Sequence, residues 1–196
     1  MFKNIFSKII KNKPINNINF FNKTYSSCFN MKHYNNFYIN RRSMSSYFND
    51  KHDFIYFKEN LDEIKNMEKL NVKFGFSNYA LNNLNNIVYA EYYKDIFDVI
   101  DRDDVVGNVE SVKASIDVMP NLNGKLTSLN QEFIDTIQEH SEATIENIQE
   151  MSDYNKENGL TILEVEVDND EINNILELIE NNEFMNEKEY EKFLDE

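Results

Sequence analysis

Lys113 lies between two segments that we predict to be β-strands, residues 105–112 and 115–119. The intervening pair, Lys113 and Ala114, is long enough for a tight hairpin turn, although it lacks the Asn-Gly sequence that most favours such turns. A lysine at a hairpin tip is presented to solvent and to enzymes that modify amines. On spacing alone, Lys113 is an ordinary surface lysine, and a modification site is the much rarer alternative.

No other pattern in the sequence points to catalysis or metal binding. There is no Gly-rich phosphate loop, no Ser-His-Asp arrangement and no HExxH motif. Cys28 is the only cysteine, so neither a disulfide nor a cysteine metal site is possible. His52 and His140 are isolated in sequence, and the many carboxylates fit a solvated acidic face. The residues by themselves therefore show neither a catalytic constellation nor a metal-binding pattern.

Charge is distributed unevenly along the 196 residues. Residues 1–49 hold eight of the 20 Lys and Arg and none of the 35 Asp and Glu, so the rest has 12 basic against 35 acidic residues, a net charge of −23. An acidic body repels phosphate backbones and therefore disfavours nucleic-acid binding. It suits partners with basic surfaces. No run of eighteen apolar residues exists, so we expect no membrane-spanning segment.

The acid-free N-terminal segment predicts a mitochondrial targeting peptide over residues 1–45 and a location in the matrix. Its first residues give an apolar helical face made of Phe2, Ile5, Phe6, Ile9 and Ile10. Residues 41–45 resemble a processing site. A disordered basic tail is the alternative, and a secretory signal fits less well because Lys and Asn interrupt the apolar stretch.

The remaining chain, residues 50–196, predicts one small α+β domain that is mostly β. Short β-branched and aromatic runs predict strands over residues 72–76, 87–91, 105–112, 115–119, 125–129 and 161–167. The last run alternates, which predicts a buried face of Leu163, Val165 and Val167 and an opposite face of Ile162, Glu164 and Glu166.

Capping residues and apolar spacing predict the helices. Ser77 can cap a helix over 78–86, residues 130–150 favour one or two helices, and Asp168 or Asn169 can begin the next. Asn186 can cap a last helix. Expected inward-facing residues are Tyr79, Ala80 and Leu84 in the first helix, Ile172, Ile175, Leu176 and Ile179 in the third segment, and Tyr190, Phe193 and Leu194 in the last.

The residues around Lys113 resemble the lipoylation motif of the glycine cleavage H-protein family. The motif is Glu110, Ser111, Val112, Lys113 and Ala114. The resemblance continues from about residue 52 to the C-terminus, through segments 52–55, 72–80, 84–89 and 189–194, and Asp117 stands four residues after the lysine as in the family. The chain has only four glycines, and all four align with family glycines: Gly75, Gly107, Gly124 and Gly159.

This resemblance implies a barrel-sandwich hybrid, a flattened β sandwich with C-terminal helices, in which Lys113 carries lipoic acid through an amide bond. Such a carrier is itself no enzyme. It takes an aminomethyl group from glycine decarboxylase (P protein) to aminomethyltransferase (T protein), and dihydrolipoyl dehydrogenase (L protein) then reoxidises the dithiol of the arm. A separate lipoylating enzyme attaches the arm. The resemblance gives Glu110 and Asp117 a recognition role, and Ser111, Val112 and Ala114 a flanking role that plain strand packing fits equally well.

The sequence also departs from the family. Residues 92–95 replace the family's Leu-Pro-x-x-Gly without its Pro or Gly. Of the family's Asp-Pro-Tyr-Gly-x-Gly-Trp-Leu stretch, residues 153–160 keep only Asp153-Tyr154 and Gly159-Leu160, and the chain contains no Trp. These departures leave two alternatives to a carrier active in glycine cleavage. One is an unlipoylated interaction protein on the same partners, and the other is a relay that hands lipoate to 2-oxoacid dehydrogenases.

Overall fold

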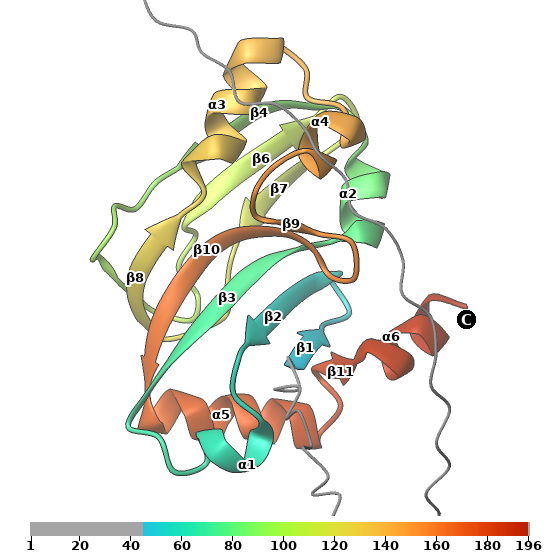
Figure 1. Cartoon of the computed structure of the whole chain (residues 1–196). Helices are drawn as coiled ribbons and strands as arrows, with labels where there is room; N and C mark the ends of the chain where they lie inside the picture. Colours follow the sequence, from blue (N-terminus) through green and yellow to red (C-terminus); the bar gives the residue numbers. More distant parts are fainter. Residues whose placement is uncertain (1–44, 196) are drawn as a thin grey trace, which may run out of the picture. The chain divides into compact units, whose positions relative to one another are not determined.

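Two antiparallel β-sheets form the framework of this computed structural model, which describes residues 45–195 (Figure 1). The larger sheet has the strand order β11-β1-β2-β3-β10-β8-β5, with β9 paired to β10, and the smaller sheet has the order β4-β6-β7. The predicted targeting segment lies outside the described residues, apart from Ser45. The larger sheet consists of β1 (Ser45–Phe48), β2 (Asp53–Phe57), β3 (Lys69–Ser77), β5 (Val99–Ile100), β8 (Gly124–Leu129), β9 (Tyr154–Asn155), β10 (Gly159–Asp168) and β11 (Met185–Asn186), and the smaller of β4 (Ile87–Tyr92), β6 (Gly107–Ser111) and β7 (Ser115–Val118).

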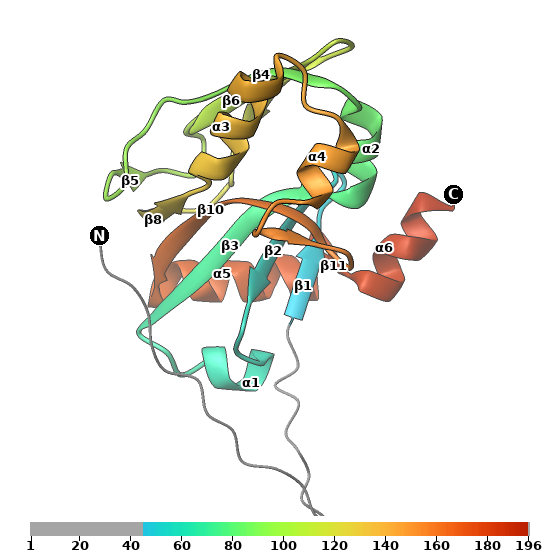
Figure 2. The same ribbon diagram turned by 45° about the horizontal axis from the view of Figure 1, so that its top comes forward.

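Helices lie around these sheets. Figure 2 shows α5 passing along the larger sheet, where it contacts β3 and β10, whereas α3 packs on β4 of the smaller one. No helix among the described residues is both long and apolar enough to cross a membrane. The helices are α1 (Leu61–Ile64), α2 (Asn78–Leu84), α3 (Gln131–His140), α4 (Ile145–Gln149), α5 (Asn169–Glu180) and α6 (Glu187–Leu194).

One apolar core joins the two sheets. Alternate residues of β3, from Leu70 to Phe76, point into it, as the period of a β-strand requires. Examples from the larger sheet are Val72, Phe74, Leu126 and Val165, and examples from the smaller sheet are Ile87, Ala90, Val109 and Val118. The predicted α+β fold is confirmed: the domain is mostly β, a flattened sandwich with helices toward its C-terminus.

Strand β10 departs from the predicted alternation at one residue. Leu163, Val165 and Val167 are buried as expected, but Ile162 is buried too. The pairing of β10 with β3 shifts between Thr161 and Leu163, which marks a β-bulge. Because a bulge turns two successive side chains toward the same side, the prediction that Ile162 lies with Glu164 and Glu166 is wrong.

The helix caps follow the sequence. The Ser77 hydroxyl accepts a hydrogen bond from the Ala80 amide at 3.2 Å, and Asp168 accepts from the Glu171 amide at 3.1 Å. Asn186 forms a capping box with Glu189. These contacts satisfy amides that the first turn of a helix leaves without partners. Each confirms the predicted start of its helix.

Tyr79 does not face inward as predicted. Its side chain is 42% exposed, while Leu81 takes the buried position in α2. The Tyr79 ring instead lies 4.4 Å from the ring of His52, which has a φ of 68° in the tight turn between β1 and β2. His52 Nδ1 in turn lies 2.9 Å from the hydroxyl of Tyr190 in α6. This contact fixes the C-terminal helix against the β1–β2 turn.

Candidate functional site

Lys113 lies at the tip of the β6–β7 hairpin, in the smaller sheet. The paired residues nearest the tip are Glu110 and Ser115, and the Ser111 amide then donates a 2.7 Å hydrogen bond to the Ala114 carbonyl. The two residues beyond this bond are Val112 and Lys113. The hairpin is therefore confirmed, but the prediction that its tip is Lys113-Ala114 is wrong by one residue.

Ser111 stabilises this turn through its side chain. Its Oγ accepts hydrogen bonds from the amides of Lys113 at 3.1 Å and Ala114 at 3.0 Å. The hydroxyl also lies 3.2 Å from the Ala114 carbonyl, to which it can donate. Serine commonly bonds nearby backbone in this way, and here the bonds replace the Asn-Gly sequence that the turn lacks. Ser111 thus holds the backbone of the lysine, a role beyond strand packing.

A second contact ties the tip to the body of the domain. The Val112 amide donates a 3.1 Å hydrogen bond to the carbonyl of Asn86, which directly precedes β4. The side-chain amide of Asn86 bonds the carboxylate of Glu142 in the α3–α4 connection. Neighbouring Ile87 exchanges two backbone bonds with Ala143. The lysine is therefore carried on a turn that is fixed on both sides.

The Lys113 side chain itself is exposed. Among the described residues, its ammonium takes part in no ion pair or hydrogen bond. Val112 beside it is 69% exposed, which leaves the space around the amine open. A primary amine on a fixed, accessible turn fits attachment of a carboxylic acid through an amide, because nothing on the protein has to be displaced.

The outward face of the smaller sheet is acidic and aromatic next to this turn. Strand register places two rows across it: Tyr89, Glu110 and Ser115 nearer the tip, then Glu91, Asn108 and Asp117. Both Glu110 and Asp117 are exposed. A hydrogen bond to the Glu91 carboxylate raises the pKa of Tyr89. The face therefore offers carboxylates at fixed positions relative to Lys113.

Asn108 organises the second row. It is only 8% exposed, and its amide donates to Ser115 Oγ at 3.0 Å, the Ile116 carbonyl at 3.2 Å and Asp117 Oδ1 at 3.3 Å. These bonds cross the hairpin and hold Asp117 in place. Sequence reasoning missed this residue. A polar side chain in the middle of a predicted strand was the signal that could have found it.

Gly107 begins the strand that leads to the turn. A Cβ on this residue would lie 2.4 Å from the carbonyl oxygen of Glu91 in β4. Such a distance is far below van der Waals contact, so any side chain would push β6 away from β4. The close approach of the two strands that carry the site therefore requires glycine at position 107.

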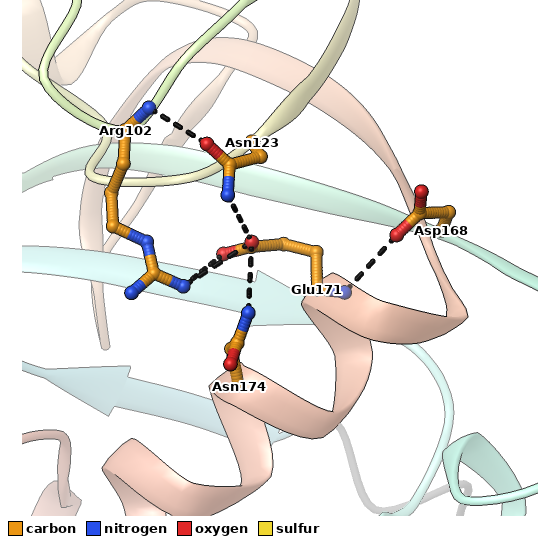
Figure 3. Close-up of polar contacts among 5 residues, drawn as sticks. All are labelled: Arg102, Asn123, Asp168, Glu171 and Asn174. Carbon is orange, nitrogen blue, oxygen red and sulfur yellow. Dashed lines mark hydrogen bonds and ion pairs between the residues drawn. The ribbon is translucent and has the colours of Figure 1, made fainter.

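The connection into β6 is anchored to α5 by a buried carboxylate (Figure 3). Glu171 is 2% exposed, and its carboxylate accepts from Arg102 Nη2 at 3.0 and 3.2 Å. It also accepts from the side-chain amides of Asn123 at 2.8 Å and Asn174 at 3.3 Å. A buried charge needs such partners, since an unpaired carboxylate in this position would be costly. The network fixes the residues that precede β6 and was not predicted.

The described residues contain no group of three His, Cys, Asp or Glu side chains that could hold a metal ion. His52 bonds Tyr190, and His140 lies 2.9 Å from the Thr136 carbonyl. Both histidines thus have local structural contacts. The site consists of an exposed amine, its turn and the flanking carboxylates.

Comparisons with known proteins find similarity to glycine cleavage H proteins. The family model described as glycine cleavage H-protein matches residues 47–142, which include the hairpin. The chain is 41% identical over 59 residues to a glycine cleavage system H protein of Acidobacterium capsulatum, and 33% identical over 81 residues to that of a Thermoanaerobacter species. These matches cover 30% and 41% of this chain and span 45% and 63% of the two relatives.

A solved structure is also similar. It is a glycine cleavage system H protein from Mycobacterium marinum, with a TM-score of 0.43 and 13% sequence identity. The match covers 68% of this chain and 98% of that one.

Proposed function

Because this chain is a divergent member of the glycine cleavage H-protein family, we propose that it is a lipoyl carrier whose arm is attached to Lys113. The observation that supports this proposal most strongly is the position of Lys113: an exposed, unpaired amine at the tip of a hairpin fixed by Ser111 and Asn86. The Glu-Ser-Val-Lys-Ala motif stands at the same turn. The family match includes these residues.

The residues of the turn present the amine to the lipoylating enzyme. The Lys113 amine would replace the leaving group on the activated carboxyl carbon of lipoate, forming an amide and losing a proton. When attached, the dithiolane supplies a redox-active sulfur pair that can accept a carbon fragment. The lysine and lipoyl chains together reach about 10–15 Å from standard bond lengths. The chain itself is a carrier and contributes effective concentration.

Within this proposal, Glu110 and Asp117 are recognition residues. Both side chains are exposed on one face of the β6–β7 hairpin, and the strand pairing fixes their positions relative to Lys113. A carboxylate can accept a charge-assisted hydrogen bond from a basic enzyme surface. Ser111, Val112 and Ala114 shape the turn: Ser111 through its hydroxyl, Val112 and Ala114 through their backbone bonds.

The partners we propose are those of glycine cleavage: the decarboxylase, the aminomethyltransferase and the dihydrolipoyl dehydrogenase. The acidic character of the domain suits enzymes with basic surfaces. We also propose a location in the mitochondrial matrix, supported by the acid-free, basic N-terminal segment. A fluorescent reporter fused after residue 45 should enter mitochondria, and entry of the full chain without residues 1–45 would contradict the proposed location.

Reconstitution tests the carrier role. The lipoylated protein, mixed with the purified decarboxylase and glycine, should support exchange of labelled bicarbonate into the glycine carboxyl group. Lys113→Arg should abolish the exchange, whereas Lys156→Arg at another exposed lysine should leave it unchanged. A lipoylated protein that supports no exchange, yet donates lipoate to a 2-oxoacid dehydrogenase, would favour the relay alternative.

A further inference from the structure

The connection between β4 and β5 displays an apolar surface that the carrier chemistry does not require. Val99 is 72% exposed, Phe97 67%, Tyr93 54% and Ile96 46%. Four large apolar side chains within seven residues, all open to solvent, exceed the scattered exposure that is normal for a surface. We call residues 93–103 the β4–β5 surface. It includes β5, an edge strand of the larger sheet (Figure 2).

The Phe97 ring is held outward by a fixed backbone. Its φ is 81°, a conformation that side chains rarely adopt and that costs free energy for a bulky residue. The Phe97 amide donates to the Leu126 carbonyl at 2.8 Å, and the Leu126 amide donates to the Asp98 carbonyl at 2.9 Å. Lys125 Nζ lies 5.0 Å from the ring centroid. The ring is thus preorganised in solvent, which lowers the cost of binding it.

The same segment holds several carboxylates that have no ion-pair partner. The two cations of the segment are already engaged, because Lys94 pairs with Asp104 at 2.9 Å and Arg102 pairs with Glu171. Four exposed acids take part in none of the ion pairs among the described residues: Asp95, Asp98, Asp101 and Asp103. An apolar centre with a charged rim is the usual anatomy of a protein interface, with an aromatic residue as its main anchor.

The charge selects the kind of partner. A nucleic acid or an anionic lipid surface would be repelled by the carboxylate rim. A complementary surface needs an apolar pocket for the Phe97 ring, framed by Lys and Arg side chains. That description fits a folded protein with a basic face.

The position of the surface relative to Lys113 indicates which kind of partner protein would bind there. Strand register pairs Ile87 with Ser111 beside the tip and Tyr92 with Gly107 at the opposite end of β6. The β4–β5 surface therefore begins about 17–20 Å along the strand from the turn. A partner bound there would leave the lysine tip unobstructed.

We propose that the β4–β5 surface is a docking site for an enzyme that acts on the arm, with Phe97 seated in an apolar pocket whose rim is basic. Docking at this distance holds the carrier while the arm moves in the active site. The identity of the partner rests on the proposed function, whereas the chemistry of the surface does not.

Binding of the full-length carrier to the three purified enzymes of glycine cleavage tests the proposal. Phe97→Ser should weaken binding to at least one of them by tenfold or more, and Asp103→Asn should weaken the same complex less. Raising the salt from 50 to 300 mM should reduce the Asp103 effect, because salt screens exposed charges. Phe193→Ser and Glu139→Gln are matched controls on α6 and α3 and should bind as the wild type does.

The outcomes separate this proposal from the carrier function. In a Lys113→Arg background, Phe97→Ser should still weaken binding, since docking does not need the arm. Equal affinity of Phe97→Ser and wild type for all three enzymes would overturn the docking proposal, as would absence of binding by the wild type, while lipoylation of Lys113 is measured separately by mass. A wild-type dimer that Phe97→Ser converts to a monomer would identify a second copy as the occupant and also overturn it. Thermal melting of Phe97→Ser within a few degrees of the wild type excludes misfolding as the cause.

Discussion

The hydroxyl of Ser111 accepts hydrogen bonds from the backbone amides of Lys113, at 3.1 Å, and of Ala114, at 3.0 Å. The residue before the tip thus fixes the backbone that carries the amine. An enzyme that must select Lys113 among the exposed lysines can recognise this rigid turn, because the side chain is always presented from the same position.

Replacement of Ser111 by alanine removes these bonds while leaving the strand pairing intact. Ser111→Ala should lower the free energy of unfolding by about 0.5–1.5 kcal/mol, the typical net contribution of such bonds. It should also slow lipoylation by about three- to tenfold, because the turn becomes mobile. Ser111→Thr retains the hydroxyl and should lipoylate at close to the wild-type rate. Equal rates for the alanine and threonine variants would show that the hydroxyl does not position the lysine.

Glu110 provides a test of recognition that is separate from stability. Glu110→Gln should reduce the rate of lipoylation by about ten- to a hundredfold, equivalent to the loss of one charge-assisted hydrogen bond at 1.4 kcal/mol per decade. The melting temperature should barely change, since Glu110 is exposed and makes no ion pair among the described residues. Glu139→Gln, exposed on α3, is the control.

A lower melting temperature for Glu110→Gln would show that its role is structural. A wild-type rate of lipoylation, measured by mass spectrometry over time, would leave Glu110 as a solvated strand residue.

Asp53 makes the stability of the domain depend on pH. Burial raises the pKa of its carboxyl to about 6, and a hydrogen bond from Asn49 offsets only part of that effect. Because the folded pKa exceeds the unfolded value, the protonated form contributes stability below about pH 4 that is lost as the pH rises through 6. Asp53→Asn should therefore be more stable than the wild type by about 1–3 kcal/mol at pH 8, from 1.36 kcal/mol per pKa unit.

The difference between Asp53→Asn and the wild type should shrink toward zero at pH 4. Denaturant unfolding at both pH values measures it, with exposed Asp50→Asn as the control. An Asp53→Asn variant less stable than the wild type at pH 8 would mean that the ionised carboxylate makes a favourable contact.

Glu171 tests whether the network in Figure 3 contributes to stability. Glu171→Ala leaves Arg102, Asn123 and Asn174 without their shared acceptor and should lower the free energy of unfolding by about 2–4 kcal/mol. Glu177→Ala, an exposed position on the same helix, should change it by less than about 0.5 kcal/mol. Urea unfolding compares the two. Similar small losses for both variants would mean that solvent replaces the network without cost.

Local signals in the sequence predicted much of the fold. Ser77, Asp168 and Asn186 begin their helices as expected, because a side-chain oxygen before an apolar stripe is a mechanism for starting a helix. The bulge that buries Ile162 could not be predicted, since it depends on pairing with a strand more than eighty residues earlier. Strands β1, β2, β5, β9 and β11 were also missed. Four of them span only two to four residues, too few to show a period, and all five residues of β2 are buried, so β2 shows no alternation.

In the candidate site, too, the local sequence predicted some features, whereas others depend on contacts between distant residues. The motif around Lys113 identified the lysine, but the exact turn needed the hydrogen bond between Ser111 and Ala114. The role of Asn108 comes from its hydrogen bonds to the neighbouring strand β7. The contact between Arg102 and Glu171 joins residues that are distant in the sequence. No periodic pattern marks such partners. The outward Phe97 depends on a positive φ, for which a phenylalanine gives no signal.

The mass of the intact protein, isolated from lipoate-replete mitochondria, tests the central claim most directly. We predict that the mature chain carries the added mass of one lipoyl group and that fragmentation places it on Lys113. Lys113→Arg should have only its unmodified mass, because arginine keeps the charge but does not form the amide. Lys156→Arg should be lipoylated as the wild type is. An unmodified wild-type protein, or a lipoyl group on any other lysine, would contradict the account.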